Sequence, residues 1–286
     1  MKESVFMYGS TFKRLRKQQH ISLVSASKNI CSLAALSRWE NNKYDLSFST
    51  VLQLLNRINI NPIEFIEMCK NNAPNRKINE IYTAYDNHHV FKLKSLVHSS
   101  FAYYNQTKKL DDLFTATNAA NLYYSLTKQN LLTAAAQYRL FNYLSNVEYW
   151  NEENILILSQ SILLLEPNIT YHLACHIICQ MKNIQVITSH NYVLSMETIL
   201  KIVSELIPTN IDLAKKLLKK IDFLKVDHSN IFFQIKKEIL KKIILYYETN
   251  NLNSILTSVE FFKSINFFKE VEEIEKLLDK NRVEGD

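Results

Sequence analysis

Apolar and polar positions follow a helical period along almost the whole chain. In the first 70 residues this pattern predicts five short helices, over 5–18, 23–29 and 33–39, then from Ser47 or Ser49, and from Pro62 to near residue 70. Ser22 and Ser32 stand directly before the second and third helices, where a side-chain hydroxyl accepts a hydrogen bond from a free backbone N–H. Asn42 follows the third helix, and asparagine tolerates the left-handed conformation that ends many helices.

The pattern continues beyond residue 76 with longer helices and short breaks. Pro167 and Pro208 each stand where one helix stops and the next begins. Such lengths and breaks are typical of antiparallel neighbours in stacked helical hairpins, although no tetratricopeptide consensus repeats cleanly. The predicted helices cover 76–87, 89–105, 111–127, 131–147, 152–165, 168–181, 191–205, 210–223, 229–249, 252–264 and 267–281.

A polar, proline-containing stretch separates the two patterns. We therefore predict a five-helix domain over residues 1–70, a linker over 71–76 and a helical-repeat domain, an α-solenoid, over 77–286. Glycine occurs only at positions 9 and 285, so hairpin turns and phosphate-binding loops lack their usual residue. The fold class expected is all-α.

Several classes of function find no support. We see no catalytic motif and no cofactor motif, so we expect a protein that is not an enzyme. No apolar run reaches the roughly 18 residues of a membrane-spanning helix, and the start resembles no secretion signal. We expect a cytoplasmic protein with no membrane partner, whose four scattered cysteines stay reduced.

The positive charge is concentrated at one end of the chain. Residues 1–70 carry ten Lys or Arg and five Asp or Glu residues, whereas the remainder carries 24 and 23. A basic small segment joined to a neutral larger one favours a polyanion-binding module with an attached sensor, and a merely solvated charged face is the alternative.

The segment CSLAALSRWENN (31–42) resembles the third helix of the lambda-repressor-like helix-turn-helix family. Asn42 replaces the glycine of that pattern. The resemblance implies that residues 32–38 form a recognition helix in the DNA major groove. Leu33 and Ala34 then touch thymine methyl groups, and Arg38 grips guanine. The implied DNA-binding residues are Lys13, Arg14, Lys17, Ser32, Leu33, Ala34, Ser37, Arg38 and Lys43.

Arg16 has two interpretations. Its position resembles that of a family arginine that pairs with the glutamate ending the third helix, here Glu40, and a phosphate contact is the alternative.

The segment YLSNVEYWNEEN (143–154) is similar to one in the Rgg/GadR/MutR regulators, and the length and the terminal run FFKSINFF (261–268) agree with that family. Asn151 stands where the family has glycine, which leaves the local turn open. The resemblance implies a homodimeric, quorum-sensing-type transcription regulator that binds promoter DNA. It also implies a regulatory and dimerisation domain that binds a short hydrophobic signalling peptide. A regulator without peptide ligand, controlled by metabolic state or a protein partner, is the alternative.

A peptide groove needs an apolar floor with amides or arginines that hold the peptide backbone. Two consecutive predicted helices offer this chemistry at Asn118, Asn121, Tyr124, Tyr138, Arg139 and Asn142. A metal site is not expected. His172, Cys175, His176 and Cys179 share one stripe that is too long for a single tetrahedral zinc ion, and we interpret it as a packing face.

Overall fold

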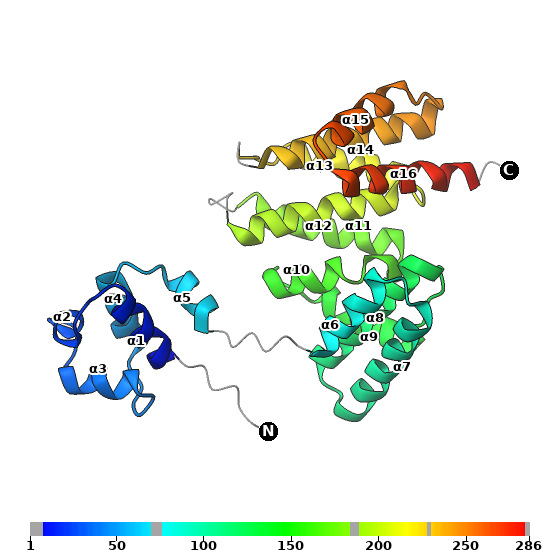
Figure 1. The fold of residues 1–286 in the computed structure, drawn as a ribbon. Coiled ribbons are helices and arrows are strands. Elements are labelled where there is room, and N and C mark those ends of the chain that lie inside the picture. Colours follow the sequence, from blue (N-terminus) through cyan, green and yellow to red (C-terminus); the bar gives the residue numbers. More distant parts are fainter. Residues whose placement is uncertain (1–7, 70–75, 184–188, 228–229, 284–286) are drawn as a thin grey trace. The chain divides into compact units, whose positions relative to one another are not determined.

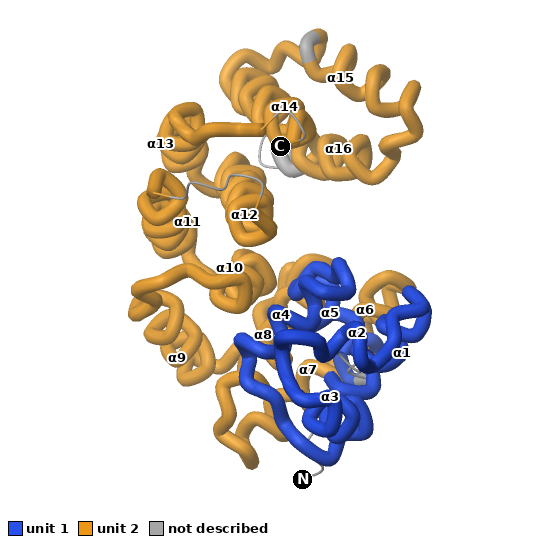
Figure 2. The backbone as a smooth tube through the Cα atoms, turned by 90° about the vertical axis from the view of Figure 1, so that its left-hand side faces the viewer, with its two compact units in different colours: residues 1–79 blue, residues 80–286 orange. Residues whose placement is uncertain are grey.

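The computed structural model describes residues 8–69, 76–183, 189–227 and 230–283 (Figure 1). Over these ranges all regular structure is helical, with sixteen α-helices and one short 3-10 helix, which confirms the predicted class. The chain forms two compact units, residues 1–79 and 80–286, called here the N-terminal and C-terminal units (Figure 2). Within the described ranges no helix is both long enough and apolar enough to cross a membrane.

The N-terminal unit contains five complete helices at the predicted places. Ser22, Ser32 and Ser47 cap the second, third and fourth helices by accepting from the backbone N–H groups of Ser25, Ala35 and Thr50. Residues 5–7 of the first predicted helix lie outside the described residues. The helices are α1 (Tyr8–Gln18), α2 (Leu23–Ser27), α3 (Leu33–Glu40), α4 (Phe48–Arg57) and α5 (Pro62–Cys69).

Helices α1 and α3 cross very closely in this unit. A methyl group at Gly9 would lie 1.8 Å from the carbonyl oxygen of Trp39, so only glycine permits this approach. Beside the crossing, the rings of Phe12 and Trp39 pack with their centroids 5.2 Å apart. All five helices contribute further buried side chains to this core, and Ile58, directly after α4, joins them.

The C-terminal unit is a series of helical hairpins. Its elements are α6 (Arg76–Asp86, which contains the boundary between the units), α7 (Val90–Thr107), α8 (Leu110–Thr127), α9 (Ala134–Ser145), α10 (Glu152–Ser159), the 3-10 helix η1 (Ile162–Leu164), α11 (Pro167–Met181), α12 (His190–Leu206), α13 (Ile211–Ile221), α14 (Ile231–Thr249), α15 (Asn253–Ser264) and α16 (Phe268–Val283). The predicted linker lies outside the described residues at 71–75, and its last residue, Arg76, begins α6.

The hairpins stack in two layers within this unit (Figure 2). In one layer α12 packs between α10 and α14, and α14 continues to α16, while α11 packs on α13 in the other. One apolar core runs through the stack from Leu140 in α9 to Leu277 in α16. This arrangement is the predicted α-solenoid.

One predicted helix is wrong in its extent. The pattern predicted a single helix over 152–165, but α10 ends at Ser159 and η1 follows. The buried hydroxyl of Ser161 donates to the carbonyl of Ile157 at 2.8 Å. A serine that bonds its own backbone in this way competes with regular helix formation.

Candidate nucleic-acid interface

Helix α3 has a buried face and an exposed face. Leu36, Trp39 and Glu40 are buried in the N-terminal unit. On the opposite side Leu33 is 46% exposed, and Ala34 and Arg38 are exposed as well. The exposed face of α3 therefore begins with two apolar residues, Leu33 and Ala34, and carries the cation of Arg38 about one turn further on.

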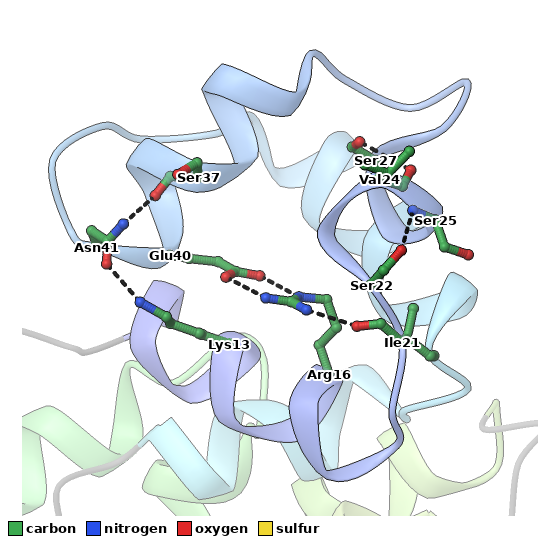
Figure 3. A network of polar contacts seen from close by, with 10 residues as sticks. All are labelled: Lys13, Arg16, Ile21, Ser22, Val24, Ser25, Ser27, Ser37, Glu40 and Asn41. Carbon is green, nitrogen blue, oxygen red and sulfur yellow. Dashed lines mark hydrogen bonds and ion pairs between the residues drawn. The ribbon is translucent and has the colours of Figure 1, made fainter.

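A buried ion pair fixes the end of α3 against α1 (Figure 3). Arg16 Nε donates to Glu40 Oε1 at 2.6 Å, and Arg16 Nη2 donates to Oε2 at 2.8 Å. Arg16 Nη1 also donates to the carbonyl of Ile21 at 2.7 Å, which ties down the chain before α2. The hydrogen bonds from Arg16 to Glu40 raise the pKa of the guanidinium. The side chains are only 7% and 2% exposed, so the structure shows the ion pair rather than a phosphate contact.

A second polar link joins the same two helices on the surface (Figure 3). Lys13 Nζ donates to Asn41 Oδ1 at 2.7 Å, and Asn41 Nδ2 donates to the carbonyl of Ser37 at 2.7 Å. Lys13, a predicted DNA-binding residue, thus holds the end of α3. The other predicted basic residues, Arg14, Lys17 and Lys43, are exposed.

Ser32 and Ser37 differ in their availability. Ser32 is exposed, but its hydroxyl accepts from Ala35 N at 3.1 Å as the α3 cap. Ser37 is half-buried, and its carbonyl is engaged by Asn41. Ser32 therefore positions α3 with its side chain, whereas Ser37 contributes only a backbone carbonyl.

Arg57 positions the helix-turn-helix and was missed from the sequence. Its two terminal nitrogens donate to the carbonyls of Ser25 and Lys28, at 2.9 and 3.1 Å, where α2 ends. These carbonyls lie at a helix end and lack partners within the helix. Because the partners are 32 and 29 residues away in the chain, no local pattern indicated them.

The predicted peptide-site residues divide into two groups. Asn118 and Asn121 are buried in α8. Asn118 Nδ2 donates to Tyr82 Oη at 3.3 Å, and Asn121 Oδ1 accepts from Leu163 N at 3.0 Å. Their amides therefore bind other parts of the stack, and a role in a ligand site stays a prediction.

The second group keeps accessible surface. Tyr138 is 66% exposed, and Tyr124 and Asn142 are half-buried. Arg139 is exposed, donates to the hydroxyl of Tyr104 and lies over its ring.

The segment around Trp150 explains how the chain manages without glycine there. Asn151 caps α10, and its side chain accepts from Asn154 N at 2.9 Å with ordinary extended backbone angles. Gln180 holds both backbone groups of Trp150, at 2.7 and 2.8 Å, and the indole is buried. Trp150 is therefore a packing anchor, and Asn151 makes the turn by capping.

The histidine and cysteine stripe of α11 lies mostly on the surface, so the predicted packing face is wrong. His172, His176 and Cys179 are exposed, and Cys175 is half-buried. Among the described residues, no three His, Cys, Asp or Glu side chains are grouped so that they could hold a metal ion.

Together these features define a class: a helix-turn-helix protein with an appended helical-repeat domain. A helix-turn-helix family model matches residues 12–65. The model for the C-terminal domain of the HTH-type transcriptional regulator Rgg matches residues 93–278, which is most of the chain. The chain belongs to the Rgg family of helix-turn-helix transcriptional regulators.

Solved structures share the fold over nearly the full length. The SHP pheromone receptor Rgg2 of Streptococcus dysgalactiae matches with a TM-score of 0.76 at 19% identity, covering 96% of this chain and 99% of the receptor. The PrgX/cCF10 complex matches with a TM-score of 0.71 at 15% identity, covering 98% of this chain and 93% of that one. A bacterial peptide pheromone/receptor complex also matches with a TM-score of 0.71 at 15% identity, covering 97% of this chain and 99% of that one. The comparison with curated proteins gave no match.

Proposed function

We propose that this regulator binds a palindromic promoter site in cytoplasmic DNA as a homodimer, and that a short hydrophobic peptide bound by its C-terminal unit switches it. The observation that carries the DNA-binding part is the exposed face of α3, held outward by the Arg16–Glu40 pair. In this proposal the protein regulates transcription through binding alone and is not an enzyme. Two copies related by a twofold axis would place two such helices about one duplex turn apart.

The DNA contacts fall into two kinds. Leu33 and Ala34 offer apolar contact to thymine methyl groups, and Arg38 offers a fork of donors to guanine. Phosphate contacts that set the register suit the basic side chains of Lys13, Arg14, Lys17 and Lys43 and the hydroxyls of Ser32 and Ser37.

The peptide proposal is supported by the fold shared with Rgg2, named a pheromone receptor, and with PrgX in its complex with cCF10. Tyr124, Tyr138, Arg139 and Asn142 offer accessible polar and aromatic groups on α8 and α9. Asn118 and Asn121, which are buried, would also belong to this site. A peptide changes transcription only if it binds one dimer arrangement more tightly than the other.

Fluorescence anisotropy with the DNA upstream of the protein's own gene tests the first part. We expect affinity to fall steeply with added salt, because phosphate contacts release counterions. Arg38→Ala should weaken binding to this DNA far more than to random duplex, whereas Arg139→Ala, in the other unit, should change neither. Binding that ignores salt, or equal losses on both DNAs for Arg38→Ala, would contradict the proposal.

Calorimetry with a panel of short hydrophobic peptides tests the second part. We expect at least one peptide to bind and to change the DNA affinity of the full chain. If none binds, the regulator answers to metabolic state or to a protein partner instead. Sedimentation of the full chain with and without DNA tests the homodimer.

A further inference from the structure

Arg38 does not extend freely from α3. Its guanidinium carbon lies 5.7 Å from the centroid of the Tyr44 ring, and its Nε donates to the carbonyl of Ala34 at a long 3.4 Å. Among the described residues, neither terminal nitrogen of Arg38 has a hydrogen-bond partner. The side chain is thus held on its aromatic face while its outer edge, which carries the remaining donors, stays available.

The loop after α3 brings Tyr44 to this place. Asn42 has a φ of 55°, and Lys43 N donates to the carbonyl of Arg38 at 2.9 Å, so the chain turns back on the helix end. Tyr44 follows directly. Tyr44 is 52% exposed, and it belongs to none of the apolar clusters formed by the described residues. The ring therefore contributes little to the core, and the Arg38 guanidinium is the partner it covers.

An aromatic ring under a guanidinium restrains it without using its donors. Cations are attracted to the face of such a ring, and arginine can stack there while its fork of N–H groups still meets a planar acceptor pair. Guanine presents such a pair, O6 and N7, in the major groove. A side chain already held in its binding conformation loses less entropy on binding.

We propose that Tyr44 is a specificity-determining residue, which positions the Arg38 guanidinium for recognition of a guanine. This inference rests on the proposed DNA-binding function and adds the residue that sets how strongly one base is preferred. Tyr44 acts through Arg38, so its loss should reduce the preference for guanine more than the affinity for DNA in general.

The test starts from a pool of duplexes with a randomised segment, from which the full-length protein selects its site. Each guanine of that site is then replaced in turn by 7-deazaguanine, which lacks the N7 acceptor and keeps the Watson–Crick edge. At one guanine we expect wild-type affinity to fall about tenfold, which is within the usual worth of a bidentate arginine contact. The same replacement should leave the affinity of Arg38→Ala unchanged.

Tyr44 variants then separate positioning from other roles. Tyr44→Ala should shrink the 7-deazaguanine effect by about two- to fivefold, the worth of an exposed cation–π contact, and Tyr44→Phe should restore it because the ring remains. Phe48→Ala is the matched control, since Phe48 is another exposed aromatic of this unit, at 69%, and should leave the effect unchanged. Circular dichroism spectra should show that all the variants fold.

Three results would overturn the inference. Equal weakening of all duplexes by Tyr44→Ala, with the 7-deazaguanine effect intact, would indicate a phosphate contact. Tyr44→Phe losing as much as Tyr44→Ala would assign the role to the hydroxyl. Arg38→Ala remaining sensitive to the replaced guanine would show that another residue reads it. A pool without any enriched sequence would contradict the proposed function itself, and this inference with it.

Discussion

The two units fix their helices by different means. In the N-terminal unit a small apolar core is joined to one buried ion pair and to one helix crossing that only Gly9 allows. In the C-terminal unit a continuous apolar core runs through the stack, and single polar side chains tie down loops, such as Gln180 on Trp150 and Asn121 on Leu163. A small core gives a small free energy of unfolding, whereas stacked repeats distribute their stability over neighbouring interfaces. A substitution that costs the same free energy should therefore unfold the N-terminal unit but leave the C-terminal unit folded.

Glu40→Ala should have the largest effect. It leaves the buried Arg16 guanidinium without its partner, and breaking a buried pair in this way costs about 3–5 kcal/mol. A unit of this size has about that much stability in total. We expect thermal denaturation followed by circular dichroism to lose the transition of the N-terminal unit and to retain that of the C-terminal unit, with DNA binding abolished.

Two controls sharpen this prediction. Glu272→Ala removes one partner of the exposed Lys276–Glu272 pair and should leave the unfolding transitions almost unchanged, because solvent screens an exposed pair. The double variant Arg16→Met with Glu40→Leu should recover much of the lost stability, because no charge is left buried alone. A Glu40→Ala protein with both transitions in place would show that the pair is not what holds α3.

Gly9→Ala tests the close helix crossing through the sign of the change in stability. Helix propensity alone would make alanine more stable than glycine by up to about 1 kcal/mol. The added methyl, however, would collide with the Trp39 carbonyl, and overpacking of this kind costs about 1–3 kcal/mol. We expect a net loss in the urea-induced unfolding of the N-terminal unit; any gain in stability would exclude the crossing as described.

Gln180→Ala tests the C-terminal unit. It removes two hydrogen bonds to the Trp150 backbone, each worth about 1 kcal/mol. We expect a loss of about 1–2 kcal/mol confined to the transition of the C-terminal unit, since the apolar core around Trp150 stays in place. The matched control is Gln106→Ala on the exposed surface of α7, which should change stability by less than 0.5 kcal/mol. If the two variants lost the same amount of stability, Gln180 would not stabilise the backbone of Trp150.

Local signals predicted much of this structure. The caps at Ser22 and Ser32 and the outward face of α3 depend on neighbouring residues in the chain, and the sequence indicated them. It left the fourth helix to begin at Ser47 or Ser49, and the structure shows Ser47 as the cap. The helical period likewise predicted the stacked hairpins. It did not predict the break after Ser159, because the apolar residues of η1 continue the pattern of α10.

Most contacts across the chain were beyond the sequence; the Arg16–Glu40 pair was indicated only through the family resemblance. Arg57 and Gln180 bind backbone groups about 30 residues away, and any exposed arginine or glutamine has the same local signature. For the peptide site, the sequence placed Asn118 and Asn121 on one predicted helix. The sequence could not show that these two side chains contact Tyr82 and η1.

Asn42 gives the smallest expected effect and the sharpest test of sequence reasoning. Its φ of 55° is the left-handed conformation that the family fills with glycine. Asparagine pays a small steric cost there and alanine a larger one, about 1 kcal/mol. We expect Asn42→Gly to change the free energy of unfolding by less than about 0.5 kcal/mol, and Asn42→Ala to lower it by about 1 kcal/mol. Urea denaturation of the two variants gives the comparison. If alanine were tolerated as well as glycine, the turn after α3 would not depend on a left-handed residue, and Asn42 would not be the equivalent of the family glycine.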